Sequence, residues 1–271
     1  MNPVRFIQDI LAFPANDYDF IISDFEPISA WAGKIKKVPV IALSNQAILL
    51  EKYIPKPKTR DFLALAILKY YSPSNVKLGY SYIKFNEQVF SPMIRNELRN
   101  SVISDQGHYT VYLPSYSDEK IIDFLSKFKN TKWQLFSKNA AFDYKTANIE
   151  IFKIDKEKFT TSIVNCTGIV CNAGFETTSE ALFLGKKMMA IPQKNQYEQQ
   201  CNTHLLNLLG VHSIDKIDNK KYDIFRYWIE SDQKIQLEFP DMPYNIVERI
   251  LSLELEYSTK LSKSIIQTEL I

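Results

Sequence analysis

Short apolar runs alternate with amphipathic stretches along the second half of the chain. The runs at 109–113, 133–137 and 149–154 are rich in β-branched and aromatic residues, as buried strands are. The stretches 117–128 and 156–166 place apolar residues three and four positions apart, which predicts helices. This alternation indicates successive βαβ units around a parallel sheet.

The same rhythm continues further along the chain. We expect strands at 168–173 and 188–192, and helices over 175–185 and 196–210. Two prolines between 232 and 243 then break the pattern, before a helical run at 244–261. Five strands with intervening helices predict a nucleotide-binding type of domain.

The first hundred residues show a similar but shorter rhythm. Buried strands are expected at 19–24 and 39–44, a helix around 28–36 and a third strand at 80–85. No stretch before Tyr18 supplies a first strand with a phosphate-turn glycine. We therefore expect a first domain that is incomplete at its start, lacking roughly the first two βα units.

Composition places the chain among ordinary globular proteins. Of its 271 residues, 45% are hydrophobic and 24% are charged. The longest uncharged apolar run, 62–68, is too short to cross a bilayer. Three cysteines without a CxxC pair, and three histidines without metal-ligand spacing, predict neither a disulfide framework nor a metal site. A cytoplasmic protein is the expectation.

Charge is distributed unevenly along the chain. The net charge of +2 is too small to predict nucleic-acid binding, but 33–60 holds seven basic residues against the single acid Glu51. One interpretation is a solvated face. The other is a patch for phosphate-bearing or anionic-lipid partners, in which the apolar stretch 62–71 also takes part. A peripheral membrane contact would then run through 33–71.

The stretch NAGFETTSEALFLG, 172–185, combines a glycine turn with acids at the start of a helix. Gly174 would let a ligand approach the backbone, and the N–H groups that follow would suit a phosphate. Thr177 could add a hydroxyl, and Glu180 could accept two hydrogen bonds from a ribose diol. A glycine turn with acids that favour the helix dipole explains the same residues without a ligand.

The loop at 192–202 is dense in amide and carboxylate side chains, which suit the hydroxyls of a sugar. A solvated loop before a polar helix face is the alternative. In the first domain, Asp24 and Glu26 end a strand, and either could act as general base on an acceptor hydroxyl. A turn or helix cap before Pro27 explains these two acids equally well.

Taken together, the segment 172–202 resembles the donor-binding motif of the GT-B nucleotide-sugar glycosyltransferases. This group includes the UDP-glycosyltransferases and the N-acetylglucosaminyltransferase of the peptidoglycan lipid intermediate. The sequence of this segment looks closest to a bacterial and archaeal branch of the group. The resemblance implies an α/β fold of GT-B type with two Rossmann-like domains, the first truncated at its N-terminus. We expect an acceptor-side domain over 1–105, a donor-binding domain over 106–240 and a helix over 241–271 that packs back on the first domain.

The resemblance also implies roles for individual residues. Gly174 and the start of the following helix would hold the diphosphate, Glu180 the ribose, and Glu198 and Gln199 the sugar. The full expected donor set is Ser115, Gly174, Phe175, Thr177, Glu180, Gln196, Glu198, Gln199 and Asn202. The sequence departs from the plant-type pattern at Asn172, where those enzymes carry a histidine.

The implied activity is transfer of a sugar from a nucleotide-sugar donor, with UDP as the expected nucleotide and no metal or other cofactor. A lipid-linked or envelope glycan is the expected acceptor, reached at the cytoplasmic face of a membrane, and no nucleic acid is expected as a partner. Two alternatives stay open: a nucleotide-sugar epimerase of the same architecture, and a donor-binding fragment without activity.

Overall fold

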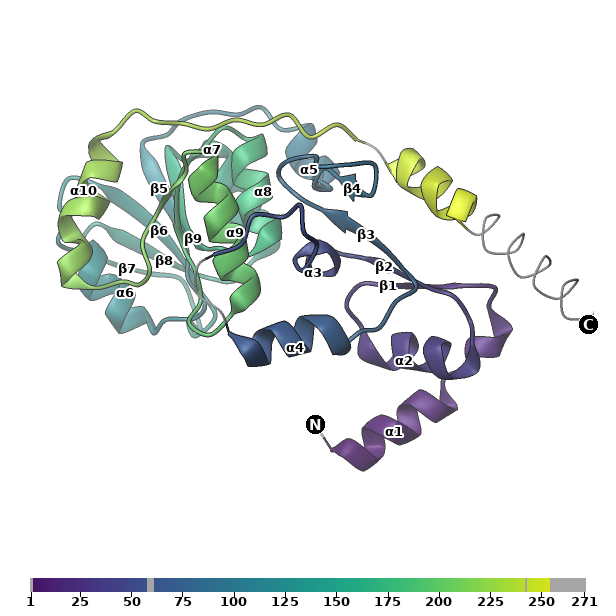
Figure 1. Ribbon diagram of the computed structural model, residues 1–271. Helices are drawn as coiled ribbons and strands as arrows, with labels where there is room; N and C mark the ends of the chain where they lie inside the picture. Colours follow the sequence, from purple (N-terminus) through teal and green to yellow (C-terminus); the bar gives the residue numbers. More distant parts are fainter. Residues whose placement is uncertain (1, 58–60, 242, 254–271) are drawn as a thin grey trace, which may run out of the picture. The chain divides into compact units, whose positions relative to one another are not determined.

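The computed structural model describes residues 2–57, 61–241 and 243–253, and the chain divides into two compact units (Figure 1). Unit 1 comprises Met1–Ile54, Phe62–Met93 and Pro240–Ile271, and unit 2 comprises Pro55–Asp61 and Ile94–Phe239. Two parts of the expectations lie outside the described residues: 58–60 of the basic stretch, and the end of the predicted C-terminal helix from 254 onward.

Unit 2 is built on a seven-stranded sheet in the order β11-β10-β9-β5-β6-β8-β7. Every neighbouring pair is parallel except β7 with β8. The strands are β5 His108–Tyr112, β6 Lys132–Ser137, β7 Tyr144–Thr146, β8 Ile149–Lys153, β9 Gly168–Asn172, β10 Lys187–Ile191 and β11 His212–Ser213. β9 and β10 are buried at every position, because helices cover both faces of the sheet at its centre.

Helices lie on both faces of this sheet (Figure 1). The helices α6 and α10 cover one face, and α7, α8 and α9 cover the other. Their bounds are α6 Asp118–Leu125, α7 Lys156–Asn165, α8 Phe175–Phe183, α9 Tyr197–Leu208 and α10 Tyr222–Glu230, with the short α5 Asn96–Arg99 before the sheet and a 3-10 turn at Asn219–Lys221. The carboxyl ends of the parallel strands meet at one edge, where doubly wound sheets bind their ligands.

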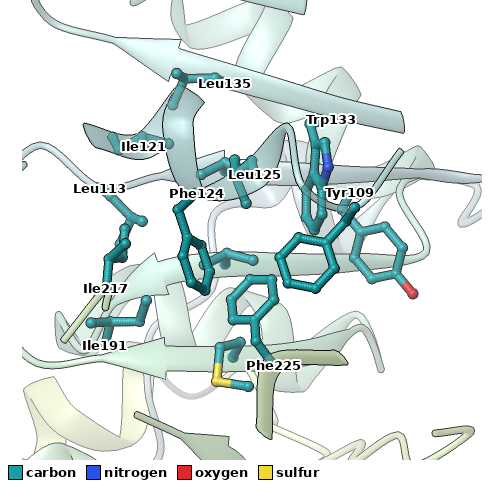
Figure 2. Close-up of a cluster of buried hydrophobic side chains, with 14 of the residues drawn as sticks. Tyr109, Leu113, Ile121, Phe124, Leu125, Trp133, Leu135, Ile191, Ile217 and Phe225 are labelled. Atoms are coloured by element: carbon teal, nitrogen blue, oxygen red, sulfur yellow. The ribbon is translucent and has the colours of Figure 1, made fainter. Parts of the chain in front are cut away.

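The core of unit 2 is aromatic, and Figure 2 shows it between the sheet and helices α6 and α10. Phe124 of α6 meets Phe225 of α10 edge to face, with ring centroids 5.1 Å apart. Trp133 and Trp228 are almost completely buried beside them. Burial of these large side chains fixes the scaffold that carries the strand ends.

Unit 1 holds a four-stranded parallel sheet in the order β1-β2-β3-β4. The elements are α1 Pro3–Ala12, a 3-10 turn at Ala15–Asp17, β1 Ile21–Ser23, α2 Pro27–Lys36, β2 Val40–Leu43, α3 Asn45–Ile48, α4 Phe62–Tyr70, β3 Val76–Tyr80 and β4 Val89–Phe90. A helix over 243–253 packs Ile246 and Ile250 against Ile41 and Leu78 of this sheet.

One strand expected from the sequence is wrong. The run 80–85 was expected to be a strand, but β3 spans Val76–Tyr80, pairing with β2 at 76–78 and with β4 at 79–80, and ends there. The Ser81 hydroxyl then accepts a hydrogen bond from the Ile83 N–H at 3.4 Å, which turns the chain out of the sheet. The apolar residues that follow belong to a loop instead, in which the ring of Phe85 packs against that of Tyr53 with their centroids 5.9 Å apart.

Candidate donor site

Helix α8 begins directly after the turn that follows β9, without a side-chain cap. Gly174 is its N-cap, and a glycine has no side chain that could accept a hydrogen bond from the N–H groups that follow. The hydroxyls of Thr178 and Ser179 donate back to the carbonyl of Phe175 at 3.1 and 2.6 Å. The N–H groups at the start of a helix point toward a ligand placed there and, together with the helix dipole, favour anions.

Gly174 differs from the other glycines of the chain. Among the seven, Gly107, Gly185 and Gly210 have positive φ, and a Cβ on Gly33, Gly79 or Gly168 would lie within 2.8 Å of neighbouring atoms. Gly174 has an ordinary φ of −69°, and a Cβ there would meet nothing within 4 Å. Neither the backbone nor the packing requires glycine at this position, and the space above it is open.

Hydrogen bonds join the neighbouring strand ends to this turn. The Ser115 hydroxyl, in the loop after β5, donates to Oδ1 of Asn172 at 3.0 Å. The Asn172 Nδ2 in turn donates to the carbonyl of Ile191 at the end of β10, at 2.8 Å. Asn172 therefore ties together the carboxyl ends of three adjacent strands, and Ser115 lies beside the donor turn.

The loop at 192–202 is held by its own amides. The Gln199 side chain accepts from the Gln193 N–H and donates to Oε1 of Gln196, both at 2.8 Å. Asn202 is fully buried and donates to the carbonyl of Ala173 at 3.1 Å, which fastens α9 to the turn. Its Oδ1 has no hydrogen-bond partner in the described part of the chain. Glu198, in the first turn of α9, is half-buried.

Glu180 is buried in α8 and forms a two-pronged ion pair that the sequence does not reveal. Nε of Arg95 donates to its Oε1 at 2.6 Å, and Nη2 donates to its Oε2 at 3.2 Å. Thr177 lies one turn before Glu180 on the same helix and is half-buried. The structure thus brings Ser115, Gly174, Glu180 and the loop of Gln199 to one region of unit 2.

In unit 1 the two acidic candidates differ. Glu26 is the N-cap of α2, and its carboxylate accepts from the Ile28 and Ser29 N–H groups at 2.8 and 2.7 Å. Partial burial raises the pKa of Glu26, but hydrogen bonds from the Ser29 hydroxyl and these N–H groups outweigh it, so the pKa lies below the ordinary value. Asp24 is exposed at the end of β1 and does not cap this helix.

A cavity of about 230 Å³ lies in unit 1 beside these acids, and its lining includes Phe25, Trp31, Lys34, Lys69 and Tyr70. Phe25 has a φ of 53°, which is rare for a bulky residue and occurs in tight turns and at functional sites. Nζ of Lys34 lies 4.8 Å from the Trp31 ring, and Nζ of Lys69 lies 5.1 Å from the Tyr70 ring. This cavity therefore combines aromatic faces with positive charge.

Two buried cysteines belong to the scaffold of unit 2. Burial raises the pKa of the Cys171 thiol to about 12 and that of Cys201 to about 11, so both are neutral and unreactive. In the described ranges, no group of three or more His, Cys, Asp or Glu side chains is arranged to hold a metal ion. Over those same ranges, no helix is long and apolar enough to cross a membrane.

A model of glycosyl transferase family 1 matches residues 8–229. The chain belongs to glycosyl transferase family 1. It is therefore a glycosyltransferase, as the motif at 172–202 predicts. A search of curated proteins finds no match to this chain.

The fold of this family 1 member agrees with that of solved glycosyltransferases. The glycotransferase of kitacinnamycin superposes with a TM-score of 0.54 at 14% identity, over 83% of this chain and 70% of that one. Arabidopsis thaliana UGT89C1, complexed with UDP-L-rhamnose, gives 0.53 at 13%, over 85% and 68%. Acinetobacter baumannii MurG gives 0.50 at 12%, over 91% and 77%. These likenesses confirm the predicted GT-B type of α/β fold.

Proposed function

We propose that this glycosyltransferase takes its sugar from a uridine diphosphate donor whose diphosphate lies over Gly174. The open space above Gly174 carries this proposal, because the fold itself gives no reason for a glycine there. The N–H groups at the start of α8 would bind the diphosphate and stabilise its charge as it leaves. The complexes of UGT89C1 with UDP and UDP-L-rhamnose support uridine as the nucleotide.

The rest of the donor would extend over the neighbouring side chains. Glu180 would accept the ribose hydroxyls, and Glu198 and Gln199 would bind the sugar. Gln196 and Asn202 would act mainly by holding the loop and the turn, since their amides already bind Gln199 and Ala173. Ser115 and Thr177 would offer hydroxyls to the diphosphate. No metal is needed in this scheme, because the helix start supplies the positive charge.

For the acceptor, the cavity of unit 1 supports an anionic molecule. Lys34 and Lys69 would attract a phosphate, and the rings of Trp31 and Tyr70 would cover apolar or sugar surfaces. A lipid-linked or envelope glycan acceptor at the cytoplasmic face of a membrane fits these properties. Asp24 is the better candidate for the general base, because the Glu26 carboxylate is occupied as a helix cap.

Thermal unfolding with a panel of nucleotides and nucleotide sugars tests the donor site, because a ligand of the folded state raises the midpoint. UDP should stabilise the parent chain. Glu180→Ala should lose the nucleoside part of the response, and Gln199→Ala should lose discrimination between sugars. Gln233→Ala, an exposed glutamine elsewhere in unit 2, should behave as the parent. No response of the parent to any nucleotide would refute the proposal.

Transfer itself is tested with UDP-sugars and phosphate-bearing glycan acceptors. Asp24→Asn should abolish product formation while UDP binding stays at the parent level, because the carboxylate removes a proton and binds no donor. The same assay in EDTA should give the parent rate. Full activity of Asp24→Asn would exclude Asp24 as the base, and loss of activity in EDTA would exclude transfer without metal.

A further inference from the structure

The ion pair between Arg95 and Glu180 constrains the carboxylate expected to bind ribose. Both carboxylate oxygens receive one N–H each from the planar guanidinium, and the Glu180 side chain is only 9% exposed. A fork of this kind fixes the plane of the carboxylate as well as its position. Arg95 thereby determines the direction in which the remaining lone pairs of Glu180 point.

The arrangement leaves acceptor capacity for a ligand. A carboxylate has about four lone-pair sites, and Arg95 occupies one on each oxygen of Glu180. In the described part of the chain no other hydrogen bond reaches these oxygens, so one site on each is available to a further donor, which matches the paired 2′ and 3′ hydroxyls of a ribose. A carboxylate free to rotate would lose entropy on binding such a diol, whereas a fixed one would not.

Arg95 is held in place by a contact to α7 as well as by Glu180 of α8. Its Nη1 lies 3.4 Å from the Thr160 hydroxyl of α7. Four residues further on, Arg99 donates to the Phe239 carbonyl at 2.8 Å and lies 5.4 Å from the ring of Phe183 on α8. Two arginines of one short segment therefore contact α8 at positions three residues apart, so the fork on Glu180 has a fixed support.

We propose that Arg95 is a positioning residue that orients Glu180 to accept the two ribose hydroxyls of the donor nucleotide. This inference rests on the proposed function, in which Glu180 binds ribose. Arg95 acts through Glu180 and need not touch the nucleotide. A loss of stability in Arg95 variants would not distinguish this role from a structural one, so the test must measure recognition of the ribose.

The experiment measures Kd by calorimetry for UDP and for 2′-deoxy-UDP, which lacks one of the two hydroxyls. The parent should prefer UDP by about tenfold, since a hydrogen bond to a charged group is lost in the deoxy analogue. Arg95→Ala should bring this ratio close to one. Arg95→Lys should give an intermediate ratio, because an ammonium cannot hold both oxygens in one plane.

Arg226→Ala is the matched control, since it removes an exposed arginine that pairs with Glu230 in the same unit, and its ratio should equal that of the parent. In a Glu180→Ala background, Arg95→Ala should change the ratio no further. A further change there would mean that Arg95 contacts the ribose directly, and it would overturn the positioning role.

An unchanged ratio in Arg95→Ala would overturn the inference, and Arg95→Lys carries the same test if the alanine variant does not fold. A parent that binds both nucleotides equally would overturn it while leaving the donor site intact. Failure of the proposed function looks different, because the parent would then bind neither nucleotide.

Discussion

Around the turn between β9 and α8, three polar side chains hold the backbone in place, whereas Gly174 in that turn faces open space. Asn172, Gln199 and Asn202 form hydrogen bonds to the neighbouring loops, which keep the strand ends in place. The backbone at Gly174 faces a space that no described atom fills within 4 Å of an added Cβ. Ligand contact at this turn is therefore expected mainly from main-chain N–H groups.

Replacing Gly174 by alanine should separate binding from stability. The φ of −69° suits alanine, and the added methyl meets no protein atom, so the free energy of unfolding should change by less than about 1 kcal/mol. The methyl would occupy the place of the diphosphate, and UDP affinity measured by calorimetry should fall at least roughly tenfold, a loss of about 1.4 kcal/mol.

Gly168→Ala is the contrasting control for Gly174→Ala. Its Cβ would lie 2.8 Å from both Cβ and the carbonyl oxygen of Lys187, so overpacking should destabilise the fold by about 1 to 3 kcal/mol. Chemical denaturation of both variants measures the two changes. Undiminished UDP binding by Gly174→Ala would remove the diphosphate from this turn.

At this scale the sequence identifies residues whose partners are near in the chain. The turn at Gly174 and the loop of Gln199 are local patterns, so they can be located without a structure. Arg95 could not be found in this way, because its partner Glu180 lies 85 residues further on. The helix cap by Glu26 had a local signal in the following Pro27, but the pattern suited a catalytic acid equally well.

At the scale of elements, most segments from β5 to α9 were predictable, whereas β7 and α10 were not. The helices α6 to α9 and the strands β5, β6, β8, β9 and β10 agree with the expected ranges. The strand β7 has three residues, too few for an alternation to stand out. The helix α10 escaped prediction although it buries Phe225 and Trp228 three residues apart, a spacing that could have identified it.

The contact between His108 of β5 and Ser162 of α7 should make the free energy of unfolding depend on pH. His108 of β5 is buried, and its Nε2 lies 3.2 Å from the Ser162 carbonyl of α7. Burial lowers the pKa of His108, against the hydrogen bond to Ser162, which raises it. The unfolded chain, with a histidine pKa of about 6.5, then binds the proton first as the pH falls.

The stability that this contact contributes should accordingly be fully present above about pH 6.5 and be lost as the pH falls below it. The free energy of unfolding should fall by at most about 1.4 kcal/mol per pH unit for one proton. His108→Gln keeps a donor for the Ser162 carbonyl but does not titrate, so urea unfolding between pH 5 and 7.5 should show a smaller slope. Burial also lowers the pKa of His212, so His212→Gln should reduce the slope independently of His108→Gln, and the two reductions should add in the double variant. Equal slopes for His108→Gln and the parent would contradict this assignment.

At the scale of the whole molecule, the net charge of +2 hides a concentration of apolar and basic side chains in unit 1. No residue of α4 is buried, and Phe62 and Leu63 are 78% and 72% exposed. Lys69 lies in the last turn of the same helix and lines the basic cavity. Exposed apolar side chains near lysines are the combination that binds anionic membrane surfaces.

Binding to lipid vesicles tests this property in the full chain. We expect sedimentation with vesicles containing phosphatidylglycerol, weaker binding to neutral vesicles, and release at 1 M salt, where the Debye length is about 3 Å. Phe62→Glu should lower the partition constant onto these vesicles at least roughly tenfold, because a phenyl ring buried in the membrane contributes about 1.5 to 3 kcal/mol. The matched control is Phe142→Glu in unit 2, whose side chain is 71% exposed. If both variants lose binding equally, α4 is not the membrane contact. If the parent does not sediment with anionic vesicles, the exposed apolar residues of α4 have another role.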